Sequence, residues 1–273
     1  MPPPGSLERV LARDRLLIAA TLAVLVALAW AYLLMLARRM GNDAGLAAMA
    51  SMPDMPGMPG MGGRGAEEPA ARAFALTALM WWTMMIGMML PSAAPMVLLF
   101  GTVQRRQLAA ENPALRVAVF TLGYVVTWGA FSVLAAAAQT VLAASALLAP
   151  MDLTLTARVG AVFVALAGLY ELTPLKNVCL RHCRSPAEFL SSHWRPNTSG
   201  ALGMGVEHGI YCIGCCWLLM GLLFVVGVMN LFWVAAIAVF VLLEKIVPRG
   251  EAVARASGIA LLAFAAYLAL GER

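Results

Sequence analysis

Long apolar runs separated by short polar segments dominate the chain. A membrane-spanning helix needs roughly 20 apolar residues. Runs near that length cover residues 16–37, 74–100, 115–139, 156–174, 201–226, 229–247 and 252–270. The run at 229–247 is the least distinct, because it is short and closely joined to its neighbours. The pattern predicts an all-α, polytopic helical membrane protein with about seven transmembrane helices and no soluble domain.

The composition agrees with this class. Hydrophobic residues make up 62% of the chain and charged residues 12%, whereas soluble domains carry about 25% charged residues. The formal charge is only +5, and the basic residues form no stripe with interleaved aromatic residues. The sequence therefore predicts no nucleic-acid partner, and its main environment is the lipid bilayer.

Basic residues predict how the helices are oriented, because Lys and Arg concentrate in cytoplasmic loops. With the N-terminus inside, the inner segments hold 13 of the 19 Lys and Arg residues and the outer segments hold 6. Arg38 and Arg39, directly after the first run, oppose the rule. The counts favour an N-in, C-out protein, and we expect a multi-pass protein of the bacterial inner membrane.

Three segments follow from the same pattern. Residues 1–39 are expected to be an N-terminal anchor helix, because the apolar run is too long for a signal peptide and no small-residue cleavage site follows it. Residues 40–73 are rich in Met, Gly and Pro and are expected to form a flexible extracytoplasmic loop. Residues 74–273 are expected to form a six-helix metal-binding membrane domain.

The most informative polar residues open the run at 201–226. On a helical wheel, one face carries Met204, His208, Tyr211, Cys212 and Cys215, while Cys216 lies at its edge and Glu207 points elsewhere. Thiolate, imidazole and thioether groups are metal ligands. We predict a metal site at His208, Cys212, Cys215 and Cys216, with Met204, Tyr211 and Glu207 as auxiliary residues. The alternative is a set of buried apolar cysteines beside a hydrogen-bonded histidine.

Methionines form two further sets. A ladder of one Met in every three residues lies in the predicted loop, at Met49, Met52, Met55, Met58 and Met61. A helical stripe lies in the second run, at Met80, Met84, Met85, Met88 and Met89. A thioether is an uncharged soft ligand that suits Cu(I), so we predict outer metal capture by the ladder and a membrane site including Met84, Met85, Met88 and Met89. The alternatives are compositional drift in a linker and ordinary helix packing.

A second thiol group lies in the predicted cytoplasmic segment 175–199. Cys179, His182 and Cys183 could chelate an ion if this segment is helical, and Arg181 and Arg184 flank them. All five cysteines and all three histidines of the chain lie between Cys179 and Cys216. The alternative is a pair of reduced loop thiols that bind nothing.

Several of these residues also carry a family resemblance. They include the Met84–Met89 segment with Pro91 and Pro95, the Cys179/Cys183 pair, the string Tyr-Cys212-Ile-Gly-Cys215-Cys216-Trp217, and Glu244-Lys245. Together they resemble a bacterial family of predicted metal-binding integral membrane proteins, a domain-of-unknown-function family, over residues 74–270. The resemblance implies metal binding, and the family's label is sometimes extended to copper handling.

The predicted function is soft-metal binding in the membrane. We expect Cu(I) to be captured and passed across the membrane or to a membrane partner, such as another membrane or periplasmic copper protein. Zinc is an alternative for His208, Cys212 and Cys215, but it would leave the methionines unexplained. Two other functions stay open: a transmembrane thiol–disulfide electron carrier and a non-transporting metallo-cofactor assembly factor. We predict no catalytic residues and no enzyme activity, and an oligomer is compatible with the sequence.

Overall fold

The computed structural model describes residues 4–50, 70–106, 112–148 and 154–271. Regular structure in these ranges is helical, apart from one antiparallel bridge between Leu148 and Leu155. The helices are α1 (Pro4–Ala50), α2 (Ala70–Arg106), α3 (Pro113–Ala144), α4 (Ala157–Glu171), α5 (Pro174–Arg184), α6 (Pro186–His193), α7 (Thr198–Gly221), α8 (Leu223–Val226), α9 (Leu231–Ile246) and α10 (Gly250–Gly271).

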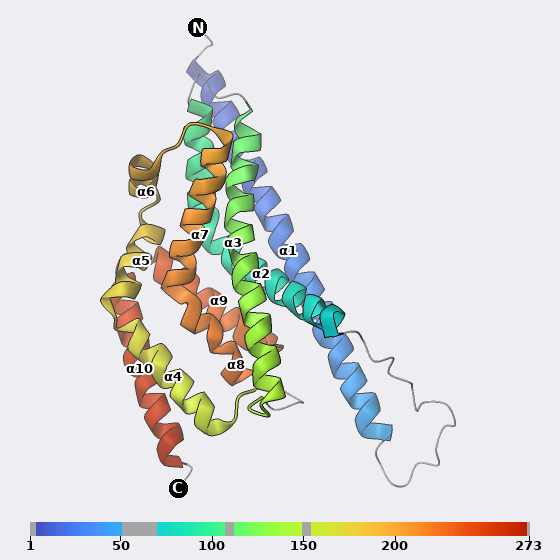
Figure 1. The fold of residues 1–273 in the computed structure, drawn as a ribbon. Helices are drawn as coiled ribbons and strands as arrows, with labels where there is room; N and C mark the ends of the chain where they lie inside the picture. The colour runs from blue at the N-terminus through green and yellow to red at the C-terminus, as the bar shows by residue number, and fades with distance from the viewer. Residues whose placement is uncertain (1–3, 51–69, 107–111, 149–153, 272–273) are drawn as a thin grey trace.

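The long helices α1, α2, α3 and α7 form the body of the protein (Figure 1). The largest interfaces join α3 to α7, α2 to α3, α1 to α2 and α4 to α10. Helices α5 and α6 run along one side, where α5 packs on α7, and α9 packs on α2. Helices α2, α3, α7 and α9 meet at the centre of this arrangement. The cysteines of α7 and Met89 of α2 lie there.

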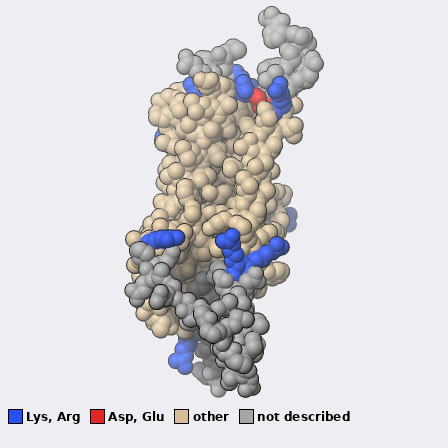
Figure 2. All heavy atoms as spheres, turned by 90° about the vertical axis from the view of Figure 1, so that its right-hand side faces the viewer, with Lys and Arg blue, Asp and Glu red and all other residues tan. Residues whose placement is uncertain are grey.

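Five helical segments of the described chain are long and apolar enough to cross a membrane. They are Ala12–Arg39, Ala70–Arg106, Pro113–Ala144, Thr198–Val226 and Gly250–Leu270. Helices α4 and α5 would form a sixth span together, although they meet at a bend of 64°. Figure 2 shows an uncharged band of surface between two groups of Lys and Arg. The predicted all-helical fold is confirmed for the described residues, with five candidate spans, and the count of about seven spans and the N-in, C-out orientation stay predictions.

Two expected segments differ from the structure. The run at 229–247 forms α9, whose 16 residues make it shorter than a typical span. Residues 40–50, expected to belong to a loop, are helical, because α1 continues to Ala50. Residues 51–69 lie outside the described ranges.

Helix α2 passes through two prolines and changes direction along its length (Figure 1). Proline has no N–H group, so Pro91 cannot bond to the carbonyl of Gly87, four residues earlier. The indole N–H of Trp30 on α1 donates to that carbonyl at 3.3 Å. The helix irregularity therefore provides a contact site for α1.

The contact between α3 and α7 depends on small residues, as the Gly205/Gly209 spacing predicts. A Cβ atom at Gly205 would collide with the backbone carbonyl of Phe120, and one at Gly209 would lie 2.8 Å from the Cβ of Thr127. The two backbones can be this close only because these positions lack side chains. This approach places the cysteines of α7 beside α2 and α3.

We expect Gly205→Ala to destabilise the protein by about 1–3 kcal/mol, because α7 would have to move away from the Phe120 backbone. Gly203→Ala is the matched control. Its Cβ would meet only the flexible end of Arg195, so little or no loss is expected. Thermal unfolding in detergent measures both, and equal melting temperatures for the two variants would contradict the contact.

Candidate metal centre

A cluster of buried sulfur atoms lies between α7 and α2. Cys212, Cys215 and Cys216 on α7 are each at most 1% exposed. The Cys216 thiol lies 3.8 Å from the thioether sulfur of Met89 on α2. Met84, Met85 and Met88 are also buried on α2. The structure thus places Met89, one member of the predicted Met stripe, beside the cysteine face.

Cys212 is the most connected member of the cluster. Its sulfur lies 3.0 Å from the ammonium nitrogen of Lys245, at the end of α9, and 3.1 Å from the hydroxyl of Tyr124 on α3. Lys245 also donates to the Ser92 hydroxyl at 2.9 Å, and Tyr124 donates to the Met89 carbonyl at 3.0 Å. Four helices therefore meet around one sulfur atom.

Cys215 and Cys216 are oriented differently from Cys212. Both thiols donate to the backbone carbonyl of Cys212, at 3.1 and 3.0 Å. This is a weak local bond along the helix, so rotation about the Cα–Cβ bond is enough to turn either sulfur toward another partner. The two thiols can therefore change partners without any movement of α7.

Helix α5 contributes a fourth cysteine. Cys183 interacts with both Cys212 and Cys215, and it is partly exposed. Cys179, one turn earlier, instead packs on the backbone of α7, since its sulfur would lie 2.7 Å from a Cβ atom at Gly214. Of the two predicted loop thiols, Cys183 interacts with Cys212 and Cys215, whereas Cys179 lies at the edge of the cluster and interacts with Cys215.

His208 lies one helical turn away in an aromatic cage. Its ring is 2% exposed and contacts Tyr124, Phe189 and Phe120, with ring centroids 5.7, 5.6 and 6.3 Å away. Its Nδ1 atom is buried without a hydrogen-bond partner in the described structure. His208 neighbours Cys212 through Tyr124, which contacts both.

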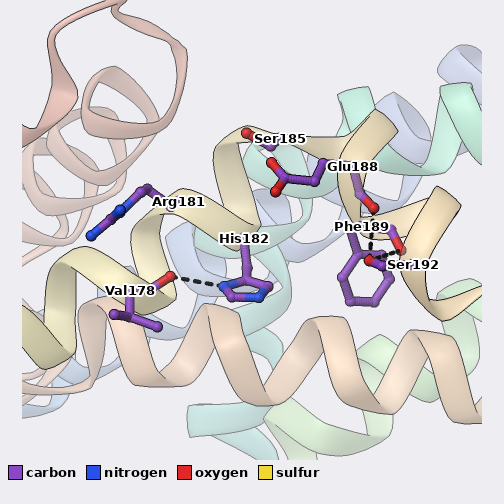
Figure 3. Close-up of a pocket in the computed structure, with 7 residues that line it drawn as sticks. All are labelled: Val178, Arg181, His182, Ser185, Glu188, Phe189 and Ser192. Atoms are coloured by element: carbon purple, nitrogen blue, oxygen red, sulfur yellow. Dashed lines mark hydrogen bonds between the residues drawn. The ribbon is translucent and has the colours of Figure 1, made fainter.

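The other predicted polar residues form an outer group between α5, α6 and α7. The His182 ring stacks on Tyr211 with centroids 4.1 Å apart, and Glu207 pairs with His193 at 3.2 Å. A pocket of about 250 Å³ opens beside them, and its wall includes His182 and Phe189 (Figure 3). In Figure 3 the His182 ring lies close to the Val178 carbonyl, which its Nδ1 contacts at 2.9 Å, and Arg181 points away.

The remaining predicted ligands are placed as follows. Met204 is buried in the core of α7. The ladder positions Met52, Met55, Met58 and Met61 lie outside the described residues, as does the side chain of Met49. Among the described residues, no group of three or more His, Cys, Asp or Glu side chains is arranged to hold a metal ion as it stands. Any soft-metal site here would combine thiols with the Met89 thioether and would require the thiol rotations described above.

A buried ionic triad lies directly beside the sulfur cluster. Lys176 on α5 pairs with Glu171 on α4 and with Glu244 on α9, the latter at 2.8 Å. All three side chains are at most 1% exposed. Glu244 and Lys245 are adjacent residues, so the last turn of α9 joins the triad to Cys212. The sequence analysis did not identify Glu171, Lys176, Tyr124 or Ser92. An ionisable residue inside an apolar run was the available signal for Glu171.

Comparison with known families agrees with this chemistry. Residues 78–268 match the profile of the PpoB2 family, described as a copper chaperone family. The chain belongs to this family. The match confirms the family resemblance and supports a copper-related role. No curated protein and no solved structure matches the chain.

The segment of the chain that matches the family includes every cysteine and the whole Met stripe of α2. It also includes the ionic triad and Lys245. It leaves out α1 and the Met ladder. The family match thus covers the buried centre and does not extend to the N-terminal part of the chain.

We expect Lys176→Met to destabilise the protein strongly, by roughly 3–5 kcal/mol, because it leaves two buried carboxylates without their cation. Thermal unfolding in detergent measures the loss. The triple variant Lys176→Met with Glu171→Gln and Glu244→Gln removes the uncompensated charges and should recover part of it. If the triple variant is no more stable than Lys176→Met, uncompensated buried charge is not the cause of the lost stability.

Proposed function

We propose that the protein binds Cu(I) in the sulfur cluster and passes it across the membrane or to a partner copper protein. The observation that carries this proposal is the convergence of Cys183, Cys212, Cys215, Cys216 and the Met89 thioether at one buried place. Thiolate and thioether sulfurs are the ligand types that select Cu(I). The family description supports copper as the cargo.

The charge of the site favours Cu(I) over zinc. Cys212 already faces the ammonium group of Lys245, so an arriving cation meets a positive charge in an apolar surrounding. Bringing a singly charged ion into such a place costs less than bringing a doubly charged one. Zinc sites in proteins use Cys, His and carboxylate ligands, which leaves the contact between Met89 and Cys216 without a role.

Copper would enter or leave the cluster through α5. Cys183 is a partly exposed residue of α5 whose thiol faces inward to Cys212 and Cys215, whereas Cys212, Cys215 and Cys216 are buried residues of α7, so the cysteines lead from α5 into the core. Transfer from one sulfur to the next keeps the ion bound throughout. In the N-in orientation, α5 faces the cytoplasm of a bacterial inner membrane, and the Met ladder would collect copper on the opposite side.

Copper binding provides the direct test. The purified protein, loaded with Cu(I) and desalted, should retain the ion, and Cys212→Ser/Cys215→Ser/Cys216→Ser should lose most of it. Cys179→Ser is the comparison variant, because its sulfur packs on Gly214 at the edge of the cluster and interacts with Cys215, and it should retain more copper than the triple variant. Elemental analysis gives the content. Equal copper in the triple variant and the wild type would exclude this site.

Transfer is tested separately from binding. Proteoliposomes with the wild-type protein should pass Cu(I) to a chelator inside the vesicles, or to an added copper protein, and Cys183→Ser should slow this step more than it lowers copper content. A redox carrier would behave differently. Its thiols would cycle between reduced and oxidised forms in a trapping experiment, with no dependence on copper.

A further inference from the structure

A second pocket lies away from the sulfur cluster, between the end of α5 and the start of α10. Its volume is about 400 Å³, and its polar wall contains Arg181, Arg184, Arg249, Arg255, Ser185 and Glu251. These residues come from two segments that are far apart in the sequence. None of them belongs to the proposed copper site.

Positive charge strongly exceeds negative charge in this pocket. Four guanidinium groups face one carboxylate, a balance of +3 from four Arg and one Glu. The one ion pair, Arg181 with Glu251, is long at 3.5 Å, and the Arg181 side chain is 66% exposed. Such a pair contributes little. Four like charges around one cavity repel each other and attract an anion.

Arg184 lies where α9 ends and α10 begins. Its guanidinium donates to the Val247 carbonyl at the C-terminal end of α9 and lies over Gly250, the first residue of α10. A Cβ atom at Gly250 would collide with Arg184. The N-terminal end of a helix carries a partial positive charge, so acidic groups are stabilised there and cations are not. The helix end and the arginines thus add to the same positive field.

We propose that this pocket binds a phosphate group. Guanidinium groups match the geometry of phosphate oxygens and can bond to them in pairs. The charge of a phosphate group balances most of the excess, and the cavity has room for more of a headgroup around it. A free phosphate and an anionic phospholipid offer the same chemistry.

The position of the pocket favours the phospholipid. Gly250–Leu270 is one of the candidate membrane spans, and the pocket lies at its first residues. The end of a span lies near the level of the lipid headgroups. Basic pockets between helices at the cytoplasmic side are known to hold anionic headgroups. A bound headgroup would link α10 to α5, the helix that carries Cys183.

The test uses delipidated full-length protein in detergent. Native mass spectrometry measures binding of phosphatidylglycerol, phosphatidylcholine and inorganic phosphate. We expect phosphatidylglycerol to bind at least about tenfold more tightly than phosphatidylcholine, and Arg249→Gln/Arg255→Gln to lose that preference. Both side chains are exposed, so this variant should fold, and unchanged copper retention would show that the sulfur cluster is intact.

Arg38→Gln/Arg39→Gln is the matched control, because it removes the same charge from exposed positions outside the pocket. It should keep the preference. Binding of inorganic phosphate that is lost only in Arg249→Gln/Arg255→Gln would also support the site and would identify the free ion as its ligand. The proposal is overturned if neither phosphatidylglycerol nor inorganic phosphate binds better than phosphatidylcholine. It is also overturned if the two double variants bind phosphatidylglycerol and inorganic phosphate equally well.

Discussion

Two adjacent residues at the end of α9 connect the charged groups inside this protein. Glu244 pairs with Lys176 in the buried triad, and Lys245 lies 3.0 Å from the sulfur of Cys212. Charges in an apolar core are tolerated only when they are paired and hydrogen-bonded, and breaking such a pair costs several kcal/mol. That is comparable with the whole stability of a typical domain. The chemistry at Cys212 and the packing of α4, α5 and α9 therefore cannot vary independently.

The positive charge of Lys245 would also affect how a cation binds to the cluster, because it lies 3.0 Å from the sulfur of Cys212. A cation that binds Cys212 competes with the ammonium group, whose other partner is the Ser92 hydroxyl. Cys215 and Cys216 are less constrained, because their thiols donate to a carbonyl of their own helix and their other contacts are with sulfur atoms, namely Cys183 for Cys215 and Met89 for Cys216. Met89 supplies a flexible thioether that suits irregular contacts. The arrangement combines one strongly held sulfur with several that can turn, which suits a protein that binds an ion and later releases it.

The sequence predicted those parts that depend on the period of a single helix. The cysteine face of α7, the Met stripe of α2 and the small-residue contact at Gly205 follow from spacing alone. The partners of Cys212 could not be predicted, because Tyr124, Ser92 and Lys245 come from three other helices, and their meeting depends on tertiary packing. His208 illustrates the same limit. Its position on the cysteine face was read from the wheel, but its ring lies in a cage of aromatic residues from α3 and α6.

The position of Cys183 would give an ion held in the proposed copper site a route between the core and α5. An ion bound only to Cys212 and Cys216 would be shielded from water and would leave slowly. Cys183 interacts with Cys212 and Cys215 while remaining partly exposed on α5. Replacing one sulfur ligand by another changes the bonding of a soft ion little, so each step toward the surface has a small free-energy difference. A partner that offers its own thiols at α5 would then continue the same series, and the ion would move without entering water.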